Sequence, residues 1–205
     1  MDINILSVSF VGVFSTPLTM IPQLDTEFCQ NVFHNPEMTI SGYTPAGFLV
    51  KHKTFPVPSI LINPAKIVII ANNLNDLLNL VSAVATQLEN PYFASYGLNS
   101  EIEWRCKENA EDWLNLNFIQ QNKRLGKITN KCRKVNLIFD VTDKESLNID
   151  FEPRMGVENG VFASVNHHHD YPMTGFPNQE LLNNEFSNSL KVVAQHITNL
   201  VLSNE

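Results

Sequence analysis

Two stretches of the chain repeat apolar residues at the spacing of an α-helix. Over residues 74–89 and 179–203, apolar side chains recur every three or four positions, so each stretch would carry one apolar stripe. Asn73 stands where a helix N-cap is expected. Asn90 and Pro91 end the first stretch, because proline disfavours helical geometry in the residue before it. We predict an amphipathic helix over each stretch.

Elsewhere apolar and polar residues alternate, as they do in strands with one buried face. In the second half of the chain the apolar residues point one way and acidic or amide residues point the other, which predicts an antiparallel sheet with one wet face. Residues 112–121 fit either a strand or a helix. Strands are predicted over residues 5–14, 47–53, 59–62, 66–71, 100–106, 135–141, 147–151 and 161–167.

A weak internal repeat adds to this pattern. Residues 60–74 and the segment that begins at Asn148 both have the order strand, turn with proline and a basic residue, strand, Asn, helix. Either a duplicated β-β-α unit or a chance match would explain it. We predict one α+β domain over residues 1–205, in which an antiparallel, twisted sheet carries the two helices on one face.

Composition agrees with a single folded domain. The chain has 205 residues, of which 43% are apolar and 17% charged, enough apolar surface to form a core. No apolar run approaches the roughly 20 residues that cross a bilayer, and the first basic residue is Lys51, so no basic region precedes an apolar signal segment. Three cysteines without CxxC spacing favour a reducing compartment. We expect a cytoplasmic protein.

The charge is distributed unevenly. The formal net charge is −7, which argues against general nucleic-acid binding. One stretch is nevertheless strongly basic, and it could bind an acidic protein partner or nucleic acid, with Trp113 and Phe118 nearby to stack on bases. The other interpretation is a solvated connection between strands. The basic residues are Lys123, Arg124, Lys127, Lys131, Arg133 and Lys134.

A run of three histidines offers candidate metal ligands. His167 and His169 would lie on one face of an extended segment, where both imidazoles could bind a divalent transition metal. Asp150 or Glu152 on a neighbouring strand could supply a third ligand. The run also precedes Tyr171 and Pro172, so a strand end without any metal is the alternative.

Catalytic motifs are missing from the sequence. It contains no G-x-S-x-G, no phosphate-binding glycine loop and no H-E-x-x-H. The leading hypothesis is therefore a non-catalytic protein–protein interaction module without a cofactor, a subunit or adaptor that binds another protein or itself and resembles small chaperones in fold alone. The alternatives are a metal-dependent hydrolase or nuclease that uses His167 and His169, and a nucleic-acid-binding accessory protein that uses residues 123–134.

Overall fold

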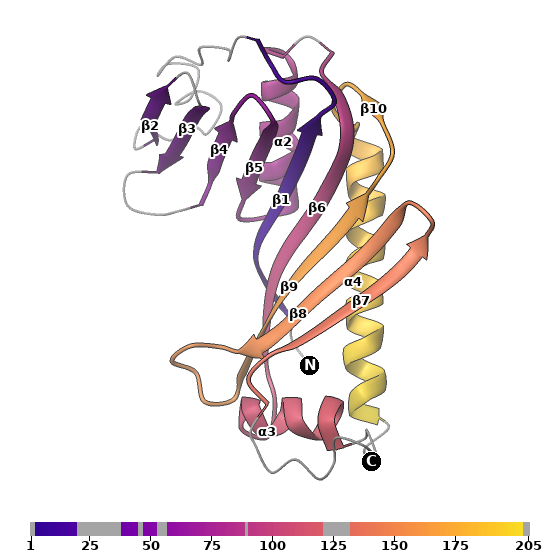
Figure 1. Ribbon diagram of the computed structural model, residues 1–205. Helices are drawn as coiled ribbons and strands as arrows, with labels where there is room; N and C mark the ends of the chain where they lie inside the picture. The colour runs from indigo at the N-terminus through magenta and orange to yellow at the C-terminus, as the bar shows by residue number, and fades with distance from the viewer. Residues whose placement is uncertain are drawn as a thin grey trace.

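The computed structural model describes residues 3–19, 38–44, 47–52, 57–88, 90–120 and 132–202, and ten strands of these residues form one antiparallel sheet (Figure 1). The strands are β1 (Asn4–Phe14), β2 (Met38–Thr44), β3 (Gly47–His52), β4 (Ser59–Ile62), β5 (Lys66–Ala71), β6 (Tyr92–Arg105), β7 (Val135–Thr142), β8 (Glu145–Pro153), β9 (Gly160–His169) and β10 (Met173–Thr174). The helices are α2 (Leu74–Ala85), α3 (Ala110–Leu114) and α4 (Gln179–Leu202), and a π-helical turn, η1 (Asn115–Gln120), continues α3.

The sheet has the same strand order on both sides of its centre. The order is β2-β3-β4-β5-β1-β6-β9-β8-β7, with β10 paired to β6. From β1 outward the strands are β5, β4, β3 and β2, and from β6 outward they are β9, β8 and β7, so β2 alone has no counterpart on the other side. The two predicted β-β-α units, β4-β5-α2 and β8-β9-α4, therefore occupy equivalent places, although the equivalent set of strands is larger than the sequence indicated.

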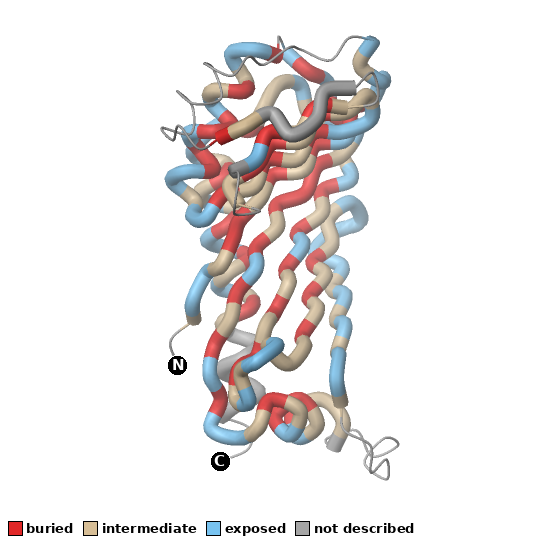
Figure 2. Tube along the Cα trace, turned by 90° about the vertical axis from the view of Figure 1, so that its left-hand side faces the viewer, coloured by how far each residue is buried: buried red, intermediate tan, exposed pale blue. Residues whose placement is uncertain are grey.

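Alternation along the strands separates a packed face from a solvated one, and Figure 2 shows buried positions alternating with less buried ones. The packed face carries two clusters of buried apolar residues. One includes residues of α2 together with Leu182 and Phe186 of α4. The other includes Trp104 of β6, Trp113 of α3 and Val193 of α4. The helix α4 thus contributes to both clusters, and both main helices lie on one face, as predicted.

The long helix keeps its polar side in solvent. Asn184, Ser187, Asn188 and Lys191 are exposed, as the pattern predicted for the face opposite the apolar stripe. No helix among the described residues is long and apolar enough to cross a membrane.

Most of the predicted strands are confirmed, with two differences. The strand predicted at residues 100–106 is the second half of a longer strand, β6, and neither β2 nor β10 was predicted. The ambiguous stretch is helical as far as Gln120, and Gln121 lies outside the described residues. Asn109 caps α3 by accepting a hydrogen bond from the backbone N–H of Glu111. Trp113 and Leu114 are consecutive residues of α3 and both are buried. Their packing therefore follows the helical stripe and not the alternation of a strand.

Candidate metal centre

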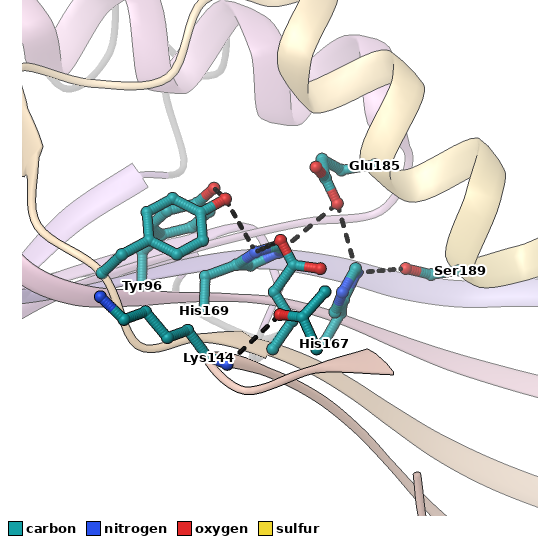
Figure 3. A network of polar contacts seen from close by, with 9 residues as sticks. Tyr96, Lys144, His167, His169, Glu185 and Ser189 are labelled. Carbon is teal, nitrogen blue, oxygen red and sulfur yellow. Dashed lines mark hydrogen bonds and ion pairs between the residues drawn. The ribbon is translucent and has the colours of Figure 1, made fainter. Parts of the chain in front are cut away.

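Strand alternation decides where the three histidines point. His167 and His169 are buried on the packed face of β9, whereas His168 is half-buried on the other face, opposite Gly97 of β6. The buried pair lies beneath α4, and Figure 3 shows both rings directed toward Glu185 and Ser189 of that helix. The structure thus confirms the prediction that His167 and His169 lie on one face of the strand.

His169 is enclosed by aromatic rings. Its side chain is 0% exposed and stacks on Tyr96, with ring centroids 4.4 Å apart and an interplanar angle of 11°. Its Nδ1 lies 3.2 Å from the Tyr171 hydroxyl and 3.6 Å from Oε1 of Glu145. The hydroxyls of Tyr171 and Tyr96 are themselves 2.9 Å apart. Burial raises the pKa of both phenols, so both stay protonated and can donate hydrogen bonds.

His167 connects the strand to the helix. Its ring centroid is 4.2 Å from that of His169. Its Nδ1 lies 3.0 Å from Oγ of Ser189 and 3.3 Å from Oε2 of Glu185. The same Glu185 oxygen lies 3.4 Å from Nε2 of His169. One carboxylate of α4 therefore contacts both imidazoles.

Burial sets the charge of these groups. Loss of solvation, reinforced by His167 and His168, lowers the pKa of His169 to about 4. Burial also lowers the pKa of His167, although the nearby Glu145 opposes this. Contact with carboxylates would by itself favour imidazolium, but here the cost of burying a charge is larger. Burial and Glu145 together raise the pKa of Glu185. Both rings are thus neutral near pH 7, the form that binds metals.

The hydrogen bonds leave one nitrogen of each ring without a partner. In the tautomer with the proton on Nδ1, His167 donates to Ser189 and His169 donates to the Tyr171 hydroxyl. Both Nε2 atoms then keep a lone pair. These two Nε2 atoms are buried and have no hydrogen-bond partner. Metal-binding histidines commonly have this arrangement, in which the ring nitrogen that does not bind the metal donates a hydrogen bond to another group.

Glu145, His167 and His169 form a group that could hold a metal ion, with one ligand atom from each residue within 4.8 Å of the others. Glu145 reaches the pair because it lies directly opposite His169 in the β8–β9 ladder. The predicted third ligand, Asp150, does not join them. It lies on the opposite face of the sheet, where Oδ2 is 3.2 Å from Nζ of Lys134 and Oδ1 accepts a hydrogen bond from Asn136.

Signals were available in the sequence for the site residues that were not predicted. The predicted strand at residues 147–151 already put Asp150 on the face away from Leu147 and Ile149. Extending the same alternation by two residues places Glu145 on the packed face. On α4, Glu185 and Ser189 are spaced with Leu182 and Phe186 at helical intervals, so they belong to the buried stripe. Polar residues within an apolar stripe are the signal that was available.

The basic stretch is only partly described by the structure. Lys123, Arg124, Lys127 and Lys131 lie outside the described residues. Arg133 lies 3.7 Å from Glu111 and Lys134 pairs with Asp150, and both basic side chains are largely exposed. Trp113 is 3% exposed and packs edge-on against Trp104, so it is not available to stack on bases.

No family model matches the chain, and no curated protein matches it. Among solved structures, the chain is similar to a rolling circle replication initiator protein from Geobacillus stearothermophilus, with 9% sequence identity and a TM-score of 0.38. The likeness covers 82% of this chain and 76% of that chain. The fold and the cluster define an α+β protein in which two buried histidines and the half-buried Glu145 form a group that could hold a metal.

Proposed function

We propose that this chain is a non-catalytic metal-binding protein, in which Glu145, His167 and His169 hold one divalent transition metal ion. The observation that carries the proposal is the pair of buried Nε2 atoms without hydrogen-bond partners. Leaving a buried polar atom unpaired costs about 1 to 3 kcal/mol, and two of them lie on adjacent rings. A bound cation would satisfy both nitrogens at once.

The donor set favours a transition metal. Imidazole suits zinc, copper, iron and nickel, whereas magnesium and calcium prefer sites made entirely of oxygen atoms. Ligand atoms around a tetrahedral zinc ion, with bonds of about 2.0 to 2.1 Å, lie roughly 3.4 Å apart. One ligand atom from each of Glu145, His167 and His169 already lies within 4.8 Å of the others, so small side-chain movements would bring the three to this spacing. Zinc is therefore the first ion to test.

Burial favours a structural role for the metal. A catalytic ion keeps one position open to water or substrate. Here the His169 side chain is 0% exposed and the His167 side chain 10% exposed. Glu185 and Ser189 contact the same two rings from α4. The ion would therefore strengthen the attachment of α4 to β9, and we place the hydrolase alternative second.

Zinc titration of the untagged protein, freed of metal with a chelator, tests the proposal. We expect one zinc per chain by calorimetry and by elemental analysis after dialysis. Glu145→Gln and His169→Ala should each weaken binding more than about tenfold, because each removes a ligand. His168→Ala and Asp150→Asn are matched controls, since both residues lie on the opposite face, and both should bind zinc like the wild type.

Two results would contradict the proposal. One is the absence of stoichiometric binding of zinc, cobalt, nickel or copper to the wild-type protein. The other is equal loss of binding in the His168→Ala control, which would place the metal elsewhere. Glu145 is the more informative ligand to change, because its side chain is 24% exposed and its replacement leaves the core intact.

A further inference from the structure

The strand β7 forms one edge of the sheet. It pairs with β8 and ends the strand order, so no other described strand pairs with its outer side. Two of its apolar side chains are strongly exposed, Ile138 at 65% and Val141 at 53%. The backbone N–H and C=O groups on the outer side of an edge strand form a template for pairing with another chain, and exposed apolar side chains favour that pairing.

β7 has few of the devices that usually protect such an edge. Edge strands are commonly blocked by lysine, by proline, by a bulge or by being short. β7 has eight residues without lysine or proline, and Asp140 is its only charged residue. Its one irregularity lies at the end of the strand, between Asp140 and Thr142. The stretch from Val135 to Phe139 is regular.

The sequence of β7 is complementary to itself when it is read in the opposite direction. In an antiparallel pair of two copies centred on Ile138, that residue would face its own copy. Leu137 would face Phe139 and Asn136 would face Asp140, so apolar side chains meet apolar ones and no two like charges oppose each other. Self-complementarity of this kind is what a twofold interface between identical chains requires.

We propose that β7 is a self-association edge, through which two copies of this chain pair antiparallel about a twofold axis at Ile138. The two sheets would then form one continuous sheet, and the exposed Ile138 side chains would bury each other across the axis. The site is independent of the metal centre, because Ile138 points away from the packed face on which His167 and His169 lie. The occupant is a second copy of this chain rather than a peptide of another protein.

The test combines molar mass with charged substitutions at the axis. At high protein concentration, light scattering should give a molar mass of about twice the 23.2 kDa of one chain. On dilution, the molar mass should fall toward that of one chain. Ile138→Lys and Ile138→Glu should each raise the dimer dissociation constant at least about tenfold, because each places two like charges face to face. Met155→Lys is the matched control, since Met155 is 95% exposed and lies off this edge, and it should remain dimeric.

Mixing the two charged variants makes the test specific for the axis. An equimolar mixture of Ile138→Lys and Ile138→Glu should restore the dimer, because lysine of one copy then faces glutamate of the other. A wild-type chain that stays monomeric at about 100 μM overturns the proposal, since protein–protein contacts of even modest strength form at that concentration. A dimer that withstands both substitutions, or a mixture that does not recover, overturns it as well.

Discussion

His169 shows how burial can override a neighbouring charge. The ring is completely buried against Tyr96, and two carboxylates lie within 3.6 Å of its nitrogens. In water such neighbours would favour the charged ring. Here solvent is excluded, so the neutral ring is the stable form and its pKa falls to about 4. The same neutral ring is what a metal ion needs, so the metal and the proton compete for this site.

The stability of the metal-free protein should therefore fall in mild acid. Between pH 6.5 and about 4, unfolded His169 takes up a proton that the folded ring does not, so stability rises with pH across this window. We expect a loss of about 2 kcal/mol from this ring between pH 7 and pH 5, measured by urea unfolding with a chelator present.

His169→Phe isolates this effect, because phenylalanine can still stack on Tyr96 and takes up no proton. His167 acts in the same direction as His169, whereas Glu185, whose pKa is raised, acts in the opposite one. The pH-dependent loss should be about 2 kcal/mol smaller in the variant than in the wild type. Equal pH dependence of both proteins would show that His169 does not titrate as described.

The candidate site was half predictable from the sequence, for a physical reason. Alternation along one strand fixes which residues share a face, and it identified His167 with His169. Choosing the third ligand needs the register between strands, and His169 lies opposite Glu145. Register depends on the turn and on the whole sheet, so the sequence did not identify Glu145, although alternation along residues 147–151 already argued against Asp150. The stripe of α4 marked Glu185 and Ser189 as facing the sheet, but that they meet His167 depends on tertiary packing, which the stripe alone does not give.

Local chemistry fixes the start of α2 more firmly than packing does. The Asn73 side chain accepts a hydrogen bond from the backbone N–H of Asp76 at 3.0 Å, and its amide donates to the Asp76 carboxylate at 2.8 Å. These bonds satisfy a backbone donor that the first turn leaves free. This is why the predicted N-cap is the observed one.

Removing this cap should weaken the whole domain, because α2 covers β1 and β5. We expect Asn73→Ala to lower the free energy of unfolding by about 1 kcal/mol, measured by urea denaturation. Asn79→Ala is the matched control, since Asn79 is exposed within the same helix and alanine is the better helix former there. The control should be neutral or slightly more stable, and an equal loss in both variants would argue against the capping role.

The elements that were missed are those whose residues carry weak patterns. The first half of β6 contains Ala94, Ser95 and Gly97 among its larger side chains, so apolar alternation there is faint. It is nevertheless a strand, because it pairs with β1 on one side and with β9 on the other. The turn η1 is a π-helical continuation of α3, which apolar spacing alone does not distinguish from an α-helix. Pairing partners, not local propensity, decide such segments.

Across the whole molecule, α4 joins two separate apolar clusters. Its first turns contribute Leu182 and Phe186 to one cluster, and Val193 belongs to the other. Glu185 and Ser189 lie between these positions in the helix and contact His167. The polar cluster therefore interrupts an otherwise apolar helix–sheet interface. An interface with buried polar groups in its middle is weaker than an apolar one unless every group is satisfied.

Metal binding should therefore attach α4 more tightly to the sheet. Zinc at about 100 times its dissociation constant should stabilise the protein by about 2.7 kcal/mol, and raise the midpoint of thermal unfolding by roughly 5 to 10 °C. Amide hydrogen exchange should slow most in α4, whose Glu185 and Ser189 contact the imidazoles, and less in α2, which touches α4 itself. Glu185→Gln should reduce the protection of α4, because Glu185 contacts both imidazoles, whereas the exposed Glu180→Gln in the same helix should not. Zinc that stabilises the protein without protecting α4 would place its effect outside this helix–sheet contact.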